Sequence, residues 1–448
     1  MKKLFILFFL VSLSIQAQYK IKGELNTSEK YTWVILYKIE GTRQVFVKNT
    51  TITIVSNKAG KFEFDLPKDA NIGAYRISYT NDDINFVDFI FNKEDVSFSF
   101  DPKNAESTLV FTTSKENILY QKYLKAIVIA QQKIDSLQVS YLKNPSITTA
   151  NLYASQAKKI ALLQREYIQK GTGKLVQHFI IATQKYNSPE IAKTPQEYLT
   201  AILQHYFDAI NLNSPVLYNS AFLINRITDY VFYMNYSEDA ETQKKLYQKS
   251  VATVLDQVKS VSFKKDILEY LITQFVNFKN VGFVDYLFET YYETLPENIQ
   301  NAEFKKRALE KISVEIGRIA PEITWKENNT NYKLSTINEA RNYVLVFWST
   351  TCPHCLKEIP ELNAFTQDKK HIKVIAFGME ESAKDWKKHM LELKGWHHVL
   401  GLEKWEHPIP RVYQIYSTPT YIVLDSAKKI IAKPETLEEL KKIIRYLE

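Results

Sequence analysis

Cysteine is the side chain in this sequence best suited to chemistry, and the chain has two of them, Cys352 and Cys355. The pair follows directly after an apolar run at residues 343–348. That run predicts a buried strand, and residues 355–365 have the apolar spacing of an amphipathic helix. A thiol at a helix N-terminus lies among unpaired backbone N–H groups, which favour the thiolate. Because the thiolate is the reactive form, this strand–Cys-x-x-Cys–helix pattern predicts thiol–disulfide exchange.

Three other interpretations explain the cysteine pair less well. A zinc site would need two more ligands, which would have to come from distant histidines, namely His389, His397, His398 or His407. A purely structural disulfide across so short a loop would contribute only about 2 kcal/mol, and a chain of this length can bury a large core without it. Two unrelated core cysteines would not explain the helix-start position or the intervening Pro353. We therefore expect a redox pair that uses no metal and no other cofactor.

The elements expected around the pair are those of an α/β domain. The patterns predict strands at 371–378, 420–424 and 430–432, and helices at 381–393 and 436–447, the last capped by Thr436.

Four features of this region resemble a known family. They are the segment Ile319–Thr324, the strand end Phe347-Trp348, the motif Cys352-Pro-His-Cys355 followed by Glu358-Ile-Pro360, and Thr418-Pro419. On these features the C-terminal region resembles thioredoxin-fold proteins, and more closely the TlpA/ResA-like thiol–disulfide oxidoreductases of bacterial envelopes. The resemblance implies a thioredoxin fold for residues 316–448 and a cis bond before Pro419 that faces the sulfurs. The residues alone would also allow an ordinary trans proline before a strand.

The resemblance also implies roles for the residues of the motif. Cys352 would be the nucleophile that forms a mixed disulfide, and Cys355 the resolving thiol. His354, when protonated, would stabilise the Cys352 thiolate and so the reduced form. The residues expected to contact the substrate are Trp348, Pro353, His354, Thr418 and Pro419.

Glu358 is the third catalytic candidate. It lies three residues after Cys355, on the same helical face. In ResA-like proteins the matching glutamate is an acid–base group that helps to ionise the buried thiol. Classical thioredoxins use an aspartate in the preceding strand, where this chain has the apolar Val346. The alternative interpretation of Glu358 is an ordinary solvated helix glutamate.

The direction of electron flow is left open by the motif. The resemblance to TlpA/ResA-like proteins favours a reductase of protein disulfides, served by an unidentified upstream redox partner. The Pro353-His354 pair is the dipeptide of DsbA-type oxidants, so a disulfide oxidant is the alternative. A third possibility is an envelope ligand-binding protein with an accessory redox domain.

The first residues predict export. A short basic start, an apolar stretch at residues 4–13 and a small residue at Ala17 are typical of a secretory signal peptide, residues 1–17. The apolar stretch is too short for a membrane-spanning helix. No cysteine stands at its end, which excludes a lipoprotein anchor. We therefore expect an exported protein of the bacterial periplasm, without a stable membrane anchor after cleavage.

Residues 18–112 are expected to form a β-rich domain. Short strands are predicted at 31–37, 51–55, 62–66, 75–79, 86–91 and 96–100, joined by turn sequences at 57–60, 81–83 and 92–93. This spacing predicts a small antiparallel sandwich or barrel. Ile21-Lys-Gly23 and Gly60–Phe64 resemble the N-terminal β-domain often fused to TlpA-like domains.

Residues 113–315 have helical periodicity. One apolar stripe comprises Leu119, Tyr123, Ile127, Ala130, Ile134, Leu137 and Tyr141, and it ends at Asn144-Pro145. A second helix is predicted from the cap Ser214-Pro215 to Met234, with a buried face of Leu217, Ala221, Ile224, Ile227, Val231 and Met234.

The charge distribution argues against nucleic acid as a partner. The formal net charge of +8 is spread over 448 residues, and the lysines stand beside glutamates. Glycine-rich phosphate loops and serine nucleophile elbows are also absent from the sequence.

Overall fold

The structure is a computed structural model that describes residues 18–27, 29, 31–56, 59–80, 85–327 and 329–448. The chain divides into two compact units between Ile267 and Leu268. The predicted signal peptide (1–17), the turn at 81–83 and half of the turn at 57–60 lie outside the described residues.

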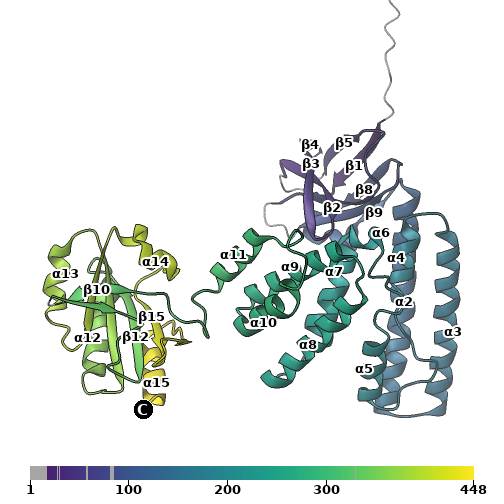
Figure 1. Cartoon of the computed structure of the whole chain (residues 1–448). Helices are drawn as coiled ribbons and strands as arrows, with labels where there is room; N and C mark the ends of the chain where they lie inside the picture. The colour runs from purple at the N-terminus through teal and green to yellow at the C-terminus, as the bar shows by residue number, and fades with distance from the viewer. Residues whose placement is uncertain (1–17, 28, 30, 57–58, 81–84, 328) are drawn as a thin grey trace, which may run out of the picture. The chain divides into compact units, whose positions relative to one another are not determined.

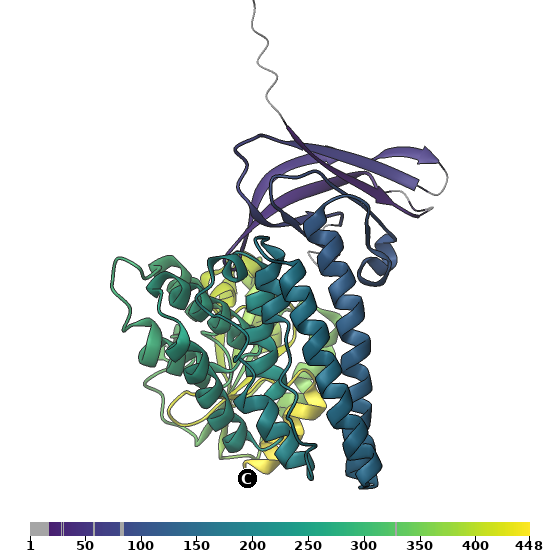
Figure 2. The ribbon, with the colours of Figure 1, turned by 90° about the vertical axis from the view of Figure 1, so that its right-hand side faces the viewer.

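The first unit begins with two packed β-sheets (Figures 1 and 2). One sheet has the order β4-β5-β1-β8-β9 and the other the order β3-β2-β6-β7. The strands are β1 (Tyr19–Leu25), β2 (Trp33–Glu40), β3 (Arg43–Thr51), β4 (Thr53–Ser56), β5 (Ala59–Leu66), β6 (Gly73–Ser78), β7 (Phe86–Phe91), β8 (Val96–Phe100) and β9 (Val110–Phe111). Their inward-facing side chains form one apolar core, which confirms the predicted sandwich.

Three strands of this sandwich had no sequence prediction: β1, β3 and β9, the last of which has only two residues and so cannot show a pattern. In β1 the apolar alternation is interrupted by Gly23, where a Cβ would collide with the Phe62 ring. Strand β3 lies at a sheet edge and exposes nearly all of its residues, so it has no buried face to give a pattern.

The helices that follow include the long pair α2 (Lys115–Lys143) and α3 (Ile147–Lys170), which lie side by side (Figures 1 and 2). Within the predicted stripe of α2, Tyr123, Ile127 and Ile134 are buried. The helix ends at Asn144, as predicted. The other helical segments of this region are η1 (Pro102–Asn104), α1 (Ala105–Thr108), α4 (Val176–Ala182), α5 (Pro195–Gln204), α8 (Ala240–Gln257) and α9 (Val261–Asn277), the last of which crosses the division between the units.

The single helix predicted from Ser214 to Met234 is wrong. The structure has α6 (Pro215–Tyr218), α7 (Ala221–Thr228) and the π-helical η2 (Asp229–Met234) in its place. Ser214 does cap the first segment, but Ser220 starts a new helix because its side chain accepts the Phe222 N–H at 3.3 Å. Serine competes in this way with the helical hydrogen bonds.

The second unit contains α10 (Val281–Leu287), η3 (Phe288–Tyr292) and α11 (Ala302–Lys311), followed by an α/β domain. The domain's main sheet has the order β14-β13-β12-β15-β16, with a β10-β11 hairpin beside it. These strands are β10 (Thr324–Glu327), β11 (Thr330–Lys333), β12 (Asn342–Trp348), β13 (Ile372–Glu380), β14 (His397–Leu402), β15 (Thr420–Leu424) and β16 (Ile430–Ala432). Strand β12 pairs with β13 in parallel and with β15 antiparallel.

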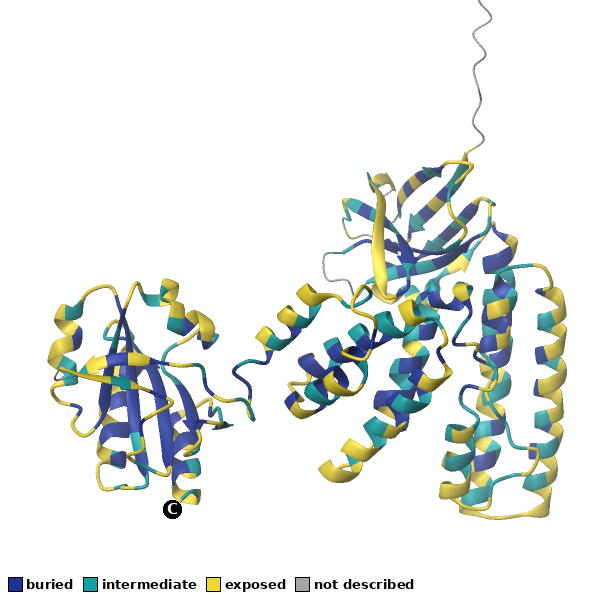
Figure 3. Cartoon of the chain, viewed as in Figure 1, coloured by how far each residue is buried: buried dark blue, intermediate teal, exposed yellow. Residues whose placement is uncertain are grey.

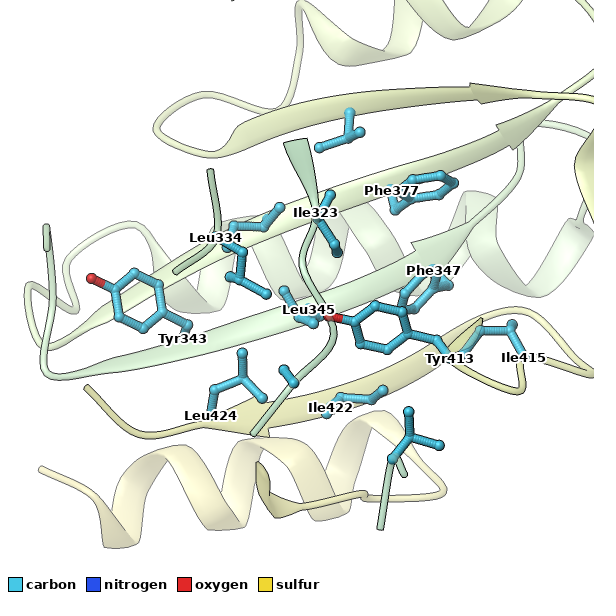
Figure 4. Close-up of a cluster of buried hydrophobic side chains, with 14 of the residues drawn as sticks. Ile323, Leu334, Tyr343, Leu345, Phe347, Phe377, Tyr413, Ile415, Ile422 and Leu424 are labelled. Carbon is cyan, nitrogen blue, oxygen red and sulfur yellow. The ribbon is translucent and has the colours of Figure 1, made fainter. Parts of the chain in front are cut away.

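Every residue of β12 is buried, because both faces of the sheet are covered (Figure 3). Alternate side chains point to opposite faces. Tyr343, Leu345 and Phe347 pack on one face with residues such as Ile323, Leu334 and Tyr413 (Figure 4). Val344, Val346 and Trp348 face the opposite core, formed with three helices: α12 (Pro353–Thr366), α13 (Ala383–Met390) and α15 (Leu437–Tyr446).

The predicted helices of this domain are confirmed, each within a few residues of the expected bounds. Thr436 caps α15 and accepts the Glu439 N–H at 3.2 Å, as its sequence pattern predicts. The short η4 (Lys404–Glu406) and α14 (Pro408–Val412) connect β14 to β15. In the part of the chain that the structure describes, none of the helices combines the length and apolarity needed to span a bilayer.

Candidate active site

The site is built where β12 ends and α12 begins. A turn at residues 349–351 joins the two elements, and Cys352 is the N-cap residue of α12. The Cys352 Sγ accepts the backbone N–H of Cys355 at 3.2 Å, so the sulfur takes the position that a serine oxygen usually has in a helix cap. Pro353 occupies the first helical position, which suits its missing N–H. Cys352 is half-buried and Cys355 is fully buried, and both are free thiols.

The loop before β15 brings a distant segment to the exposed sulfur. The Cys352 thiol donates to the Thr418 carbonyl oxygen at 3.3 Å. The Thr418–Pro419 peptide bond is cis, as the family resemblance implies. Cys352 and Thr418 meet because β12 and β15 are neighbours in the sheet.

The two thiols have opposite electrostatic surroundings. Burial opposes ionisation of Cys352, but hydrogen bonds from the Cys355 and Thr418 side chains and the backbone N–H groups of Cys355 and His354 outweigh it and lower the pKa of Cys352. For Cys355, burial dominates and raises the pKa, and the adjacent Cys352 adds to this rise. The backbone of Ser349 opposes the rise only in part. The first proton therefore leaves from the exposed thiol.

Glu358 lies on α12 and makes a contact that the sequence did not indicate. Its Oε2 accepts the Tyr421 hydroxyl at 2.8 Å. Burial raises the pKa of Tyr421, and Glu358 and both cysteines add to the rise. Tyr421 could have been suspected from sequence only through its position two residues after Pro419.

Glu380 is a second residue that sequence reasoning missed. It ends β13, is only 2% exposed, and accepts the Thr350 backbone N–H at 2.6 Å and the Thr350 hydroxyl at 2.9 Å. It thus contacts the turn that precedes Cys352. The sequence signal was weak, because Glu380 lies just past the strand predicted at 371–378.

The expected substrate-contacting residues fall into two groups. Pro353 and His354 are exposed beside Cys352. Trp348 is only 1% exposed and belongs to the core, where it lines a cavity of about 150 Å³. The other lining residues are Cys355, Leu356, Ile359, Pro360, Asn363, Ala364, Gln367, His389, Glu392 and Leu393.

The histidines considered for zinc do not gather around the cysteines. His397 lies on β14, with Nδ1 2.8 Å from Glu327 Oε2 and Nε2 2.9 Å from Glu339 Oε1. Among the described residues, no cluster of histidine, cysteine and acidic side chains has a geometry that could hold a metal ion.

Comparisons with known proteins give one family match and several similar solved structures. Residues 341–430 match the thioredoxin-like family, and no curated protein matches the chain. The chain is similar to the thioredoxin domain of a thiol–disulfide oxidoreductase from Bacteroides vulgatus, at 26% identity, with 30% of this chain and 99% of that one covered and a TM-score of 0.27. It is also similar to a thiol:disulfide interchange protein from a Bacteroides species, at 26% identity, 30% and 90% coverage and a TM-score of 0.27.

A longer match is a thioredoxin-like protein from Bacteroides caccae, at 18% identity, with 59% of this chain and 98% of that one covered and a TM-score of 0.28.

The fold and the paired thiols together define a class. The C-terminal part of this chain is a thioredoxin-like domain of the thiol–disulfide oxidoreductase type.

Proposed function

We propose that this protein is an exported thiol–disulfide oxidoreductase that exchanges disulfides with protein substrates through Cys352 and Cys355, and that it acts as a reductase. The observation that carries the proposal is the contrast between the thiols. The half-buried Cys352 has a lowered pKa and caps a helix, while the buried Cys355 has a raised pKa directly behind it. A nucleophilic thiol must be accessible and readily ionised, and a resolving thiol must stay protonated until the mixed disulfide has formed.

In the first step the Cys352 thiolate attacks one sulfur of a substrate disulfide. A new bond forms between Cys352 Sγ and that sulfur, the substrate S–S bond breaks, and the other substrate sulfur leaves as a thiolate and takes up a proton. Thr418 and Pro419 border Cys352, and Pro353 and His354 are exposed beside it, so these four residues are proposed to contact the substrate.

In the second step Cys355 loses its proton and attacks Cys352 Sγ. The mixed disulfide breaks, the substrate leaves as a dithiol, and a Cys352–Cys355 disulfide remains. We propose Glu358 as the acceptor of the Cys355 proton, with Tyr421 as the link, because Tyr421 donates to Glu358 and the charge of each cysteine contributes to the raised pKa of Tyr421. The substrate gains two electrons, so a separate upstream redox partner must reduce the disulfide again.

The opposite direction, DsbA-like oxidation of substrate thiols, has one observation in its favour. His354 is exposed at the start of α12, and its backbone N–H already favours the Cys352 thiolate. Anything that stabilises the thiolate stabilises the reduced form and makes the disulfide more oxidising.

A measured reduction potential separates the two directions. A potential of about −270 mV indicates a reductase, and a potential of about −120 mV indicates an oxidant. An insulin-reduction assay on wild type and Cys352→Ser tests the activity itself. We expect the variant to be inactive; equal rates would reject the proposal and favour a ligand-binding protein with an accessory domain.

We also propose that the thioredoxin-like domain comprises residues 316–448. The β-rich domain (18–112) and the helical domain (113–315) would then position this domain or select its partners.

A further inference from the structure

Glu380 is a buried carboxylate to which the catalytic steps above assign no role. It lies at the end of β13, one strand away from the cysteine-bearing β12–α12 connection. A carboxylate that is 2% exposed needs hydrogen-bond donors, and the donors here all come from one turn. They are the Thr350 N–H at 2.6 Å, the Thr350 hydroxyl at 2.9 Å and the Ser349 hydroxyl at 3.5 Å.

That turn is hydrogen-bonded to the backbone of Cys352. The Cys352 N–H donates to the Ser349 carbonyl oxygen at 3.1 Å, which sets the backbone of the N-cap residue. The backbone of Ser349 also opposes, in part, the rise in the pKa of Cys355. Ser349 and Thr351 are joined by their hydroxyls at 3.0 Å, and the Thr351 N–H donates to Ser349 Oγ at 3.2 Å. The side chains of this turn thus hydrogen-bond to one another, and Glu380 is the side chain from another element that binds them.

We propose that Glu380 is a positioning residue, which holds the Ser349–Thr351 turn so that Cys352 stays at the start of α12. It acts through Thr350 and touches neither sulfur. The proposal rests on the roles proposed for Cys352 and Cys355, but it concerns thiol reactivity, which can be measured without any substrate protein. Its failure is therefore distinguishable from failure of the proposed function.

The oxygen atom of the side chain, rather than its charge, is the feature that the turn requires. Glutamine keeps an oxygen that can accept the Thr350 N–H, and its amide can donate to the Thr350 hydroxyl. Alanine removes the acceptor of the half-buried Thr350 N–H. Glu380→Gln should therefore retain the site, and Glu380→Ala should loosen it.

The experiment measures the alkylation rate of Cys352 against pH in the full-length reduced protein. Below its pKa this rate follows the thiolate fraction, so a rise of one pKa unit lowers it about tenfold. We expect Glu380→Ala to lower the rate at neutral pH by about tenfold, and Glu380→Gln to stay within about twofold of wild type. An Ala variant with the wild-type pH profile would overturn the proposal.

Glu322→Ala is the matched control, because Glu322 contacts the backbone N–H and hydroxyl of Ser335 in the same manner. It should leave the alkylation profile unchanged, and an equal shift would reduce Glu380 to a general structural role. If Glu380→Ala does not fold, Thr350→Val removes only the hydroxyl contact. The proposal then requires a shift in the same direction that is larger than that of Glu380→Gln and smaller than about tenfold, and no shift beyond that of Glu380→Gln rejects it.

Discussion

At the scale of single residues, the two sulfurs differ far more than their sequence spacing suggests. Cys352 receives hydrogen bonds at an exposed helix start, whereas Cys355 is enclosed by the apolar core. The sequence could predict the exposed position of Cys352, because an N-cap is a local feature. It could not give the depth of Cys355, which depends on the packing of Trp348 and Ile359 around it.

This difference predicts separate pH dependences for the two thiols. Because its pKa is lowered, Cys352 becomes a thiolate at a lower pH than an ordinary cysteine, whose pKa is about 8.5. Because its pKa is raised, Cys355 stays protonated at pH values well above about 8.5. Iodoacetamide should therefore modify the reduced protein once, at Cys352, at neutral pH, and a second time only in strongly alkaline solution. Mass spectrometry of the products at each pH checks this.

Single-cysteine variants are the controls for that experiment. Cys355→Ala should react at slightly higher pH than wild type, because the Cys355 side chain contributes to the lowered pKa of Cys352. Cys352→Ala should react only at alkaline pH. Coincident profiles for the two variants would contradict the assignment of nucleophile and resolving thiol.

At the scale of elements, sequence patterns predicted β12, β13, β15 and β16 and the three main helices of the α/β domain because these have strong apolar periodicity, but they missed β10, β11 and β14. Strand β16 and the cap of α15 lie where the patterns put them. The helix predicted from 214 to 234 failed because Ser220 restarts it, and serine capping within a periodic run leaves little trace in the pattern. Apolar periodicity shows which residues share a buried face, but it does not show whether one helix or several successive helices carry that face.

The missing parts of the site are likewise contacts between elements. Tyr421 reaches Glu358 from β15, and Glu380 reaches Thr350 from β13. Both partnerships exist because β13 and β15 flank β12 in the sheet, and strand order cannot be read from local residue spacing. The sequence and the family resemblance therefore indicated the cysteines, Glu358 and Thr418 as candidates, but not Tyr421 or Glu380.

The bond between α12 and β15 supports a prediction about the second reaction step. If Glu358 accepts the Cys355 proton through Tyr421, Glu358→Gln and Tyr421→Phe should each slow release of the reduced substrate by about tenfold or more. Because both residues act in one path, the double variant should be no slower than the single ones. Single-turnover decay of the mixed disulfide measures this step.

Tyr413→Phe is a matched control, since it removes a buried tyrosine hydroxyl on the opposite face of the same sheet (Figure 4). It should leave the decay rate unchanged. Additive slowing in the double variant would show that Glu358 and Tyr421 act separately, and an unchanged rate in both single variants would remove Glu358 from the mechanism.

At the scale of the whole molecule, both thiols lie within the second unit, residues 268–448. The hydrogen bonds of Cys352 and the neighbouring Glu380–Thr350 and Tyr421–Glu358 hydrogen bonds all lie within this unit. The first unit is a β-sandwich with long helices.

Trapping in the full-length chain tests which proteins exchange disulfides with Cys352. In Cys355→Ala the nucleophile can still attack a substrate disulfide, but the resolving thiol is gone, so the mixed disulfide at Cys352 should persist. We expect discrete adducts that a reductant releases, and their identification gives the substrate class. The double variant Cys352→Ala/Cys355→Ala is the control, because it keeps both units and the fold but has no sulfur. Adducts equal in kind and amount in the two variants would mean that neither thiol exchanges with these proteins, and capture would then reflect binding by other surfaces of the chain.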